Sequence, residues 1–491
     1  MSGRGKKALG LNALFALLAA FGYMLIFAYN NTPLGAAIGS DNAMYLTMGT
    51  ALAKGYAPYV NVFDHKGPLL FALQQLPQEI GGGYNLTAVF LQETAALFAC
   101  LMVVYALAET LSCPPIAAQL AYLAMTCAFM DGGNLTEEYT NLPTLLALYT
   151  ALRVFERGEI REKLFAPAAL MGVCAAAAFS LRANNALPIF ALVAVLALGL
   201  LATRRFAQLG QCAAGFAAGL LIVFLPILIW LAAKDALSAA WYGAIVHNMM
   251  YAESGTGDRF AALFVTAYGH MAMAVAVFAC VGALIVWKKR RAPMLAWAML
   301  AAAAAGGLAA FLSRKFYIHY LMLGVPLACV GAAALMGSFE RPGAKRVVVL
   351  ALAAASVCWL GINGYTANQT RLSECEGLDQ FTEDAQTLMS QVPKDERDHF
   401  MAYRVEPKWY VAAKALPCMR FYFLQEILAQ ADPAVMDEIV DTFETDPPHW
   451  LVIYHNREFL PPYDARVAEI FQTKYEFVDA AGQYQLLRLK E

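Results

Sequence analysis

The segment SDNAMYLTMGTALAKGYAPYVNVFDHKGP, residues 40–68, decides how the rest of this chain is interpreted. It follows the first long apolar stretch, so it is expected to lie outside the membrane. It carries an acid at Asp41 and ends with three consecutive ionisable residues, Asp64, His65 and Lys66. A connector between two membrane helices requires none of these groups. The pattern therefore predicts that a charged molecule is handled at the membrane surface.

The composition is that of a membrane protein with an acidic tail. The 491 residues are 60% hydrophobic, and the mean hydropathy is +0.51. Residues 365–491 hold 12 Lys and Arg against 22 Asp and Glu, a net charge of −10, whereas residues 1–364 hold 23 against 15, a net charge of +8. No basic patch is interleaved with aromatic residues, so nucleic acid is not an expected partner.

Apolar stretches of about 20 residues predict helices that cross the lipid bilayer. The first is long and lacks a convincing A-x-A cleavage site, which favours an uncleaved anchor over a signal peptide. Eleven spans are predicted, near residues 8–29, 87–108, 115–130, 141–156, 164–181, 186–202, 211–233, 263–287, 294–312, 316–338 and 347–364.

The basic residues predict the orientation of these spans. With the N-terminus in the cytoplasm, the inner loops contain the clusters at 153–163, 204–205, 288–291 and 341–346, as the positive-inside rule requires. An odd number of spans then places the tail outside. We expect a multi-pass plasma-membrane protein with a membrane domain at residues 1–364, a first outer loop at 30–86 and an extracytoplasmic domain at 365–491.

The tail has the pattern of a small α/β domain. DAQTLMSQV and RVAEIFQTKY predict helices, and HFMAYR, WLVIYHN and YQLLRL predict short strands. The ten cysteines show no metal-binding spacing such as C-x-x-C. Cys375 and Cys418 are the tail's two cysteines, and they could pair if the tail is extracytoplasmic.

Asp41 precedes AMYLTMGTALAKG, which predicts a short helix from about Asp41 to Gly55. Two interpretations are open at this point. Asp41 either caps the N-terminus of that helix, a common role for Asp, or it is a carboxylate that acts as a general base at the membrane surface.

Lys66 has a similar pair of interpretations. A single lysine at a membrane interface usually extends its ammonium group toward water. Here it accompanies Asp64 and His65 in one short segment, and an ammonium group is well suited to a lipid-linked phosphate.

Glu137 and Glu138 follow DGGNLT in the second predicted outer loop. They either favour the start of the next helix through its dipole, or one of them faces the same outer cavity as Asp41.

Several cations lie on the predicted outer side, against the trend of the other basic residues. Arg182 ends one span, and Arg314 and Lys315 lie between two others, with His319 and Tyr320 close behind. Arginine binds phosphate through paired hydrogen bonds, so an anion site is expected. In the predicted loop 234–262, the polar residues either line a sugar cavity or belong to an ordinary loop; they are His247, Asn248, Tyr251 and Glu253.

The sequence contains no P-loop, no H-E-x-x-H and no G-x-S-x-G. Direct use of ATP and hydrolysis by a zinc or serine enzyme are therefore poorly supported.

These motifs together resemble the first extracytoplasmic loop of the GT-C glycosyltransferases. The matching pattern is the acid Asp41, then Y-x-x-x-x-x-A-x-x-x-G from Tyr45, Pro58-Tyr59, and D-x-K-x-P-L from Asp64. The nearest resemblance is to the bacterial branch with lipid A aminoarabinose transferase, lipopolysaccharide galacturonosyltransferases and protein O-mannosyltransferases. The acids of the second loop and the late R-x-x-Y-x-H-Y segment (Arg314, Tyr317, His319, Tyr320) also resemble that branch.

The resemblance implies a polytopic α-helical GT-C fold of about 11 transmembrane helices with a small C-terminal α/β domain. It implies an inverting transfer of a hexosyl or pentosyl group from a polyprenyl-phosphate-linked donor to an extracytoplasmic glycan, lipid or protein. Asp41 matches the family's catalytic aspartate, Lys66 matches the lysine near the donor phosphate, and Glu137 or Glu138 corresponds to the acid of the second loop. Asn42 stands where protein O-mannosyltransferases have a second acid, which argues against protein mannosylation.

From the resemblance and the residue types together, we assign catalysis to Asp41, Glu137 and Glu138. No cofactor is expected, although a divalent metal remains open. Residues expected to bind the substrate or its phosphate are Lys66, Asp64, His65, Arg182, Arg314, His319, Tyr320, Tyr59 and His247.

Other functions were weighed against this one. A transporter or flippase for an anionic lipid or lipid-linked sugar would also explain many spans and outward cations, but such proteins usually have paired halves, and no duplication is visible. A ligase that moves whole glycans and a membrane scaffold that binds a partner through its tail are further alternatives.

Overall fold

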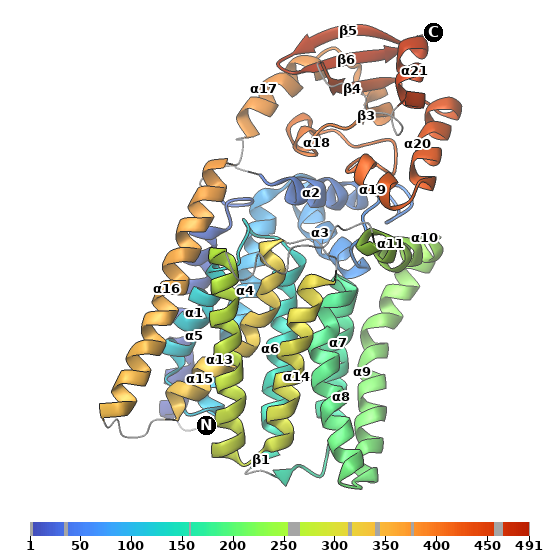
Figure 1. The fold of residues 1–491 in the computed structure, drawn as a ribbon. Helices are drawn as coiled ribbons and strands as arrows, with labels where there is room; N and C mark the ends of the chain where they lie inside the picture. Colours follow the sequence, from blue (N-terminus) through green and yellow to red (C-terminus); the bar gives the residue numbers. More distant parts are fainter. Residues whose placement is uncertain are drawn as a thin grey trace. The chain divides into compact units, whose positions relative to one another are not determined.

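The computed structural model describes residues 3–33, 38–156, 159–253, 266–312, 317–338, 344–374, 378–455 and 465–490. The chain forms two compact units (Figure 1). The helical unit comprises residues 1–29, 90–227 and 256–373, and the second unit comprises residues 30–89, 228–255 and 374–491. The predicted domain boundary near residue 365 remains a prediction.

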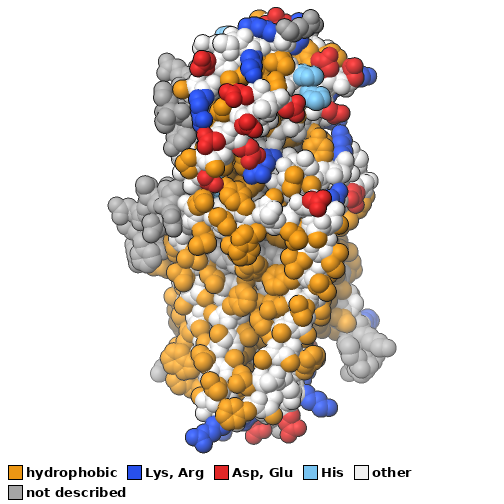
Figure 2. All heavy atoms as spheres, turned by 90° about the vertical axis from the view of Figure 1, so that its right-hand side faces the viewer, with side chains coloured by type: hydrophobic (Ala, Val, Ile, Leu, Met, Phe, Trp, Pro, Cys, Tyr) orange, Lys and Arg blue, Asp and Glu red, His pale blue; other side chains and the backbone are white. Residues whose placement is uncertain are grey.

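Long apolar helices build the helical unit. Their bounds are α1 (Gly3–Phe27), α4 (Leu86–Thr110), α5 (Pro115–Cys127), α6 (Thr136–Val154), α7 (Phe165–Leu181), η1 (Ala183–Ala186), α8 (Leu187–Ala202), α9 (Phe206–Ala232), α13 (Ala267–Arg290), α14 (Pro293–Phe311), η3 (Ile318–Gly324), α15 (Val325–Gly337) and α16 (Ala344–Glu374). A two-stranded hairpin, β1 (Phe155–Glu156) and β2 (Glu159–Ile160), joins α6 to α7. On the face drawn in Figure 2, hydrophobic side chains cover this unit, as a lipid-exposed surface requires.

In the described part of the chain, eight helices are long and apolar enough to cross a membrane. The helices α5 and α7 are apolar but shorter, and α6 begins with the polar sequence Thr-Glu-Glu-Tyr-Thr-Asn. The protein is therefore a multi-pass membrane protein. Each of the eleven predicted spans falls on a helix of this unit, but the count of eleven membrane crossings remains a prediction.

Small residues let the helices of this unit approach closely. The pattern GFAAG places Gly215 and Gly219 of α9 against α7, where a Cβ atom on either would lie within 2.2 Å of a carbonyl oxygen, of Phe165 or Ala169 respectively. This small-xxx-small pattern is a helix-packing face.

The second unit begins with two short helices, α2 (Ser40–Ala53) and α3 (Pro68–Gly81). The helix α2 ends before Gly55, whose φ of +98° favours glycine, and Pro68 starts α3 at its first position. The segment from 228 adds α10 (Leu237–Trp241), the π-helix η2 (Tyr242–His247) and α11 (Asn248–Glu253).

The tail supplies a four-stranded sheet with helices. The strands lie in the order β3-β4-β6-β5, and β3 is parallel to β4 while the other pairs are antiparallel. A fourth strand, β5, was not predicted. The elements are α17 (Leu378–Met389), η4 (Lys394–His399), β3 (Phe400–Ala402), α18 (Lys408–Ala413), α19 (Gln425–Ala431), α20 (Ala434–Thr445), β4 (Trp450–Tyr454), α21 (Ala465–Lys474), β5 (Tyr475–Ala481) and β6 (Tyr484–Leu489).

Three of the residues singled out from the sequence, Arg314, Lys315 and Cys375, lie outside the described residues. Cys418 is a free cysteine, and burial raises the pKa of its thiol to about 12.

Candidate functional site

Asp41 lies in the first turn of α2, in the second unit. The cap of this helix is Gly39, and no side chain caps it, so the interpretation of Asp41 as an N-cap is wrong. The residue is half-buried. Among the described residues, its carboxylate forms no hydrogen bond or ion pair. The carboxylate is therefore available to a ligand, while the helix N-terminus favours its negative charge.

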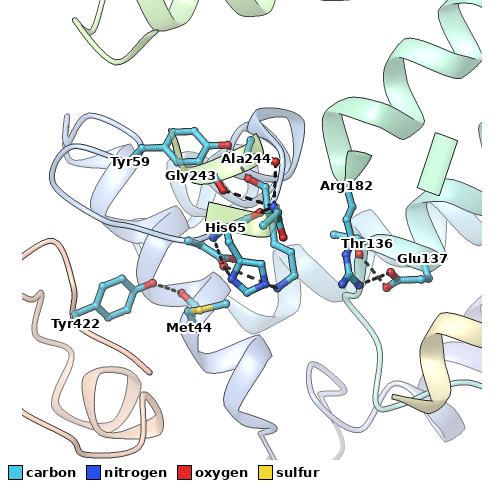
Figure 3. Close-up of polar contacts among 12 residues, drawn as sticks. Met44, Tyr59, His65, Thr136, Glu137, Arg182, Gly243, Ala244 and Tyr422 are labelled. Atoms are coloured by element: carbon cyan, nitrogen blue, oxygen red, sulfur yellow. Dashed lines mark hydrogen bonds and ion pairs between the residues drawn. The ribbon is translucent and has the colours of Figure 1, made fainter. Parts of the chain in front are cut away.

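Asp64, His65 and Lys66 form a compact cluster between α2 and α3 (Figure 3). Asp64 Oδ1 accepts a hydrogen bond of 2.6 Å from the backbone N–H of His65 and lies 3.2 Å from His65 Nδ1 and 3.8 Å from Lys66 Nζ. His65 Nε2 lies 3.3 Å from Lys66 Nζ. All three residues are buried. Lys66 therefore does not extend its ammonium group into water, and the first interpretation of this residue is wrong.

Tyr59 holds the backbone of this cluster in place. Its buried hydroxyl donates a hydrogen bond of 2.7 Å to the carbonyl of Lys66. Burial, and then the charge of Asp64, raises the pKa of Tyr59 well above its ordinary value, so the hydroxyl remains a donor. The π-helix η2 packs on the ring, and a Cβ atom on Gly243 would lie 2.7 Å from Tyr59 Cδ1. Only glycine permits this approach without displacing the ring.

His247 ends the π-helix η2, a rare element that often marks functional sites. Its ring is fully buried and lies 6.3 Å from the ring of His65. Nδ1 lies 3.5 Å from the hydroxyl of Tyr242, and Nε2 has no hydrogen-bond partner among the residues that the structure describes. Burial lowers the pKa of His247, against the opposing charge of Asp432, which favours a neutral ring. The next residue, Asn248, donates to the carbonyl of His65.

The tail contacts the same segment within the second unit. The hydroxyl of Tyr422 donates to the carbonyl of Met44 in α2 at 3.1 Å (Figure 3). The backbone N–H of Phe63 donates to the carbonyl of Arg420 at 3.0 Å. Phe63 also packs on Phe421, with ring centroids 4.9 Å apart. The tail therefore helps to position the residues on both sides of the Asp64–Lys66 cluster.

The helical unit carries a second cluster, built around Arg182 at the end of α7. Arg182 is buried, and its Nη1 lies 3.2 Å from Glu137 Oε1 (Figure 3). Its Nη2 donates a hydrogen bond of 2.7 Å to the hydroxyl of Tyr320. Its guanidinium carbon lies 4.1 Å from the ring centroid of Tyr320. Ion pairing, hydrogen bonding and ring contact together fix the plane of this guanidinium.

Asp131 joins this cluster from the loop between α5 and α6, and sequence reasoning missed it. Its carboxylate lies 3.4 Å from His319 Nδ1 and 3.1 Å from Arg371 Nε, and it accepts a hydrogen bond of 3.4 Å from Tyr29. Burial raises the pKa of Asp131, but the hydrogen bond and charge of His319, the charge of Arg371 and the Tyr29 hydrogen bond outweigh it and leave the pKa below its ordinary value. The sequence signal for Asp131 is its position at the start of DGGNLTEE, the loop segment that also contains Glu137.

Glu138 does not take part in the contacts of Arg182. It lines a cavity of about 30 Å³ within the helical unit, together with Glu93, Tyr23 and Asn141. Within the described ranges, its Oε1 has no hydrogen-bond partner. Glu93 was also missed, although a single acid inside an apolar span is a signal of function. The structure thus separates the two neighbouring glutamates, one paired with Arg182 and one lining this cavity.

No group of three or more His, Cys, Asp and Glu residues in the described ranges has the arrangement of a metal site.

The sequence-predicted residues are divided between the two units. Asp41, Asp64, His65, Lys66, Tyr59 and His247 belong to the second unit, and Glu137, Glu138, Arg182, His319 and Tyr320 belong to the helical unit.

Several solved glycosyltransferase structures have a similar fold. ArnT from Cupriavidus metallidurans bound to undecaprenyl phosphate has a TM-score of 0.60 and 14% identity over 99% of this chain and 98% of ArnT. The oligosaccharyltransferase from Archaeoglobus fulgidus has a TM-score of 0.55 and 12% identity over 90% and 68% of the two chains. The arabinofuranosyltransferase AftD from Mycobacteria has a TM-score of 0.53 and 15% identity over 99% of this chain and 40% of AftD. No curated protein matches the sequence.

The chain has the GT-C fold that these structures share, as the sequence predicted. It belongs to the competence-induced Ccs4 N-terminal domain family, whose profile matches residues 13–348.

Proposed function

We propose that this protein is an inverting glycosyltransferase that moves a sugar from a polyprenyl-phosphate-linked donor to an extracytoplasmic acceptor in the cell envelope. The fold it shares with ArnT, which was solved with undecaprenyl phosphate bound, supports this class of donor. In the plasma membrane, the N-terminus would be cytoplasmic and the tail extracytoplasmic, an orientation that the distribution of basic residues supports.

The observation that carries the proposal is the state of Asp41. Asp41 is half-buried on a helix whose following residues, 42–52, are all buried, and its carboxylate has no side-chain partner among the described residues. Within the described ranges, no hydrogen bond or ion pair of this carboxylate therefore accounts for its place in the fold. The same carboxylate is suited to accept a proton from a bound hydroxyl group. Asp41 is therefore the general base in this proposal.

The reaction is a single displacement at the anomeric carbon. The acceptor hydroxyl attacks this carbon from the face opposite the phosphate, and its proton passes to Asp41. The bond between the anomeric carbon and the phosphate oxygen breaks, and its electron pair stays on the polyprenyl phosphate. One displacement inverts the configuration, through a transition state with oxocarbenium character.

Fixed cations favour this reaction because negative charge grows on the departing phosphate. Lys66 is assigned to that phosphate, with Asp64 and His65 setting the position of its ammonium group through contacts of 3.8 and 3.3 Å. Arg182 is kept in this proposal as a phosphate-binding residue of the helical unit, with Glu137 and Tyr320 fixing its orientation. Arg314, His319, Tyr59 and His247 are kept as further substrate residues, and Glu138 as a further catalytic acid.

The experiment is a transfer assay in nanodiscs with a panel of radiolabelled polyprenyl-phosphate sugars and mixed envelope acceptors. The Asp41→Asn variant and empty nanodiscs are the controls. We expect label transfer from one donor that disappears in the variant, and the responding donor identifies the sugar.

Transport is the competing function, and a paired assay separates the two. The protein is placed in vesicles with a fluorescent lipid-linked sugar, and its movement between leaflets is followed. Facilitated movement without label transfer would contradict the proposal and favour a flippase.

A further inference from the structure

A large cavity lies at the end of the helical unit opposite the Arg182 cluster. Glu137 starts α6 and Arg153 lies in its last turn, so the two ends of this helix define the two ends of the unit. The cavity has a volume of about 1210 Å³ and lies among the last turns of α4, α6 and α13 and the hairpin after α6. This volume exceeds that of most small-molecule pockets.

Basic side chains dominate its lining. Arg153, Lys289, Arg290 and Arg291 face two acids, Glu109 and Glu159. In the described part of the chain, none of these four cations forms an ion pair with an acid. The described part of the cavity lining therefore carries an excess of two positive charges.

Two of the cations have a structural role. Arg290 donates to the carbonyl of Leu152 at 3.4 Å and to that of Thr110, and Lys289 donates to the carbonyl of Ser338 at 2.7 Å. These contacts give hydrogen-bond donors to carbonyl groups that have no partner within their own helix at its C-terminus. Arg153 and Arg291 have no hydrogen-bond or ion-pair partner among the described residues, so their charge is available to a ligand.

The positive-inside rule explains why basic residues collect at this end, but it does not require them to surround a cavity. Arg204 and Arg205 are the comparison. They follow α8 at the same end of the unit and do not line the cavity. The cavity differs because basic side chains from the ends of two helices, α6 and α13, line the same hollow. The positive-inside rule alone does not predict this arrangement.

We infer that this cavity binds the phosphate-bearing headgroup of an anionic membrane lipid. Two of the helices that end at the cavity, α4 and α13, are long and apolar enough to cross a membrane, so their last turns are expected at the level of lipid headgroups. Basic pockets between transmembrane helices commonly bind such headgroups. The site is independent of the transfer reaction and differs from the proposed donor site in all of its residues.

The experiment is lipid binding to the full-length protein in detergent, measured by native mass spectrometry with phosphatidylglycerol and phosphatidylcholine. We expect phosphatidylglycerol to bind more tightly. Arg153→Ala with Arg291→Ala should weaken it by about 30-fold, as expected for two cations near a lipid surface. Arg204→Ala with Arg205→Ala is the matched control and should change it less than 2-fold.

Three outcomes would overturn the inference. An equal loss in the control variant would mean that binding is non-specific surface attraction, and no loss in the Arg153/Arg291 variant would remove the cavity from binding. Glycerol phosphate binding as tightly as the lipid would assign the cavity to a soluble phosphate ester. The Arg153→Lys with Arg291→Lys variant keeps both charges and should retain most binding, which distinguishes loss of charge from loss of folding.

Discussion

The two charged clusters of this protein are assembled in different ways. In the second unit, Asp64, His65 and Lys66 are consecutive, so their side chains start close together and lie within 3.2 to 3.8 Å of one another. In the helical unit, Asp131, Glu137, Arg182, His319, Tyr320 and Arg371 come from separate helices and loops. A consecutive cluster can be found as a motif, whereas a dispersed one depends on the whole fold.

The dispersed cluster should depend on its pairs for stability. Arg182→Ala leaves the Glu137 carboxylate buried without its partner, which should cost about 3–5 kcal/mol. Thermal unfolding in detergent measures this, and Lys288→Ala, at an exposed site, is the control. Adding Glu137→Gln to Arg182→Ala should recover part of the loss, because no buried charge then remains. A loss below about 1 kcal/mol would mean that packing, not pairing, holds the cluster.

The same cluster should have a pH-dependent stability. The pKa of Asp131 is lower in the folded protein than in the unfolded chain, so the stabilisation is fully present above the ordinary pKa of about 3.9 and is lost as the pH falls through the lower folded value. Asp131→Asn should therefore cost about 1.5–3 kcal/mol at pH 7, and the difference from the wild type should shrink below pH 4. Measuring the free energy of unfolding of both proteins at pH 7 and below pH 4 tests this. If Asp131→Asn lowers the stability equally at the two pH values, the charge of Asp131 is not the cause.

The consecutive cluster should matter more for ligand binding than for folding. Lys66→Ala should weaken binding of a polyprenyl-phosphate donor by about 10-fold, the loss of one charged hydrogen bond. Direct donor titration in nanodiscs measures this. Lys54→Ala is the control, because Lys54 is exposed and follows α2 in the same segment. Unchanged donor affinity in Lys66→Ala would remove this residue from the site.

The contact of the tail with α2 should have the smallest effect. Tyr422→Phe removes one buried hydrogen bond, to the carbonyl of Met44, and should cost about 1 kcal/mol. Unfolding by denaturant measures the loss. Because this bond positions the helix of Asp41, we also expect a modest fall in transfer. A variant with full stability and full transfer would show that the tail does not position α2.

The apolar stretches predicted where the helices lie, because burial in lipid demands long apolar runs. The strand β5 was missed, since only Tyr475 of its seven residues is buried and the pattern Tyr-Glu-Phe-Val-Asp-Ala-Ala gives no clear alternation. The π-helix at Tyr242–His247 has no local sequence signature either, and it depends on packing against Tyr59.

The sequence singled out candidate residues where the side chains are local. Asp41, Asp64, His65 and Lys66 come from one segment, and their roles stay predictions. Asp131 was not identified, because its partners His319 and Arg371 are distant in sequence and only the helix ends bring them together. The choice between Glu137 and Glu138 also required the fold, which pairs only Glu137 with Arg182.

Comparing Asp41→Asn with the wild type in a single-turnover assay, with donor affinity measured on the same preparation, tests the central claim most directly. If Asp41 is the general base, transfer should fall by about 10²- to 10⁴-fold while the donor dissociation constant changes less than 2-fold. Transfer at the wild-type rate in this variant would contradict the assignment of Asp41 and the mechanism built on it.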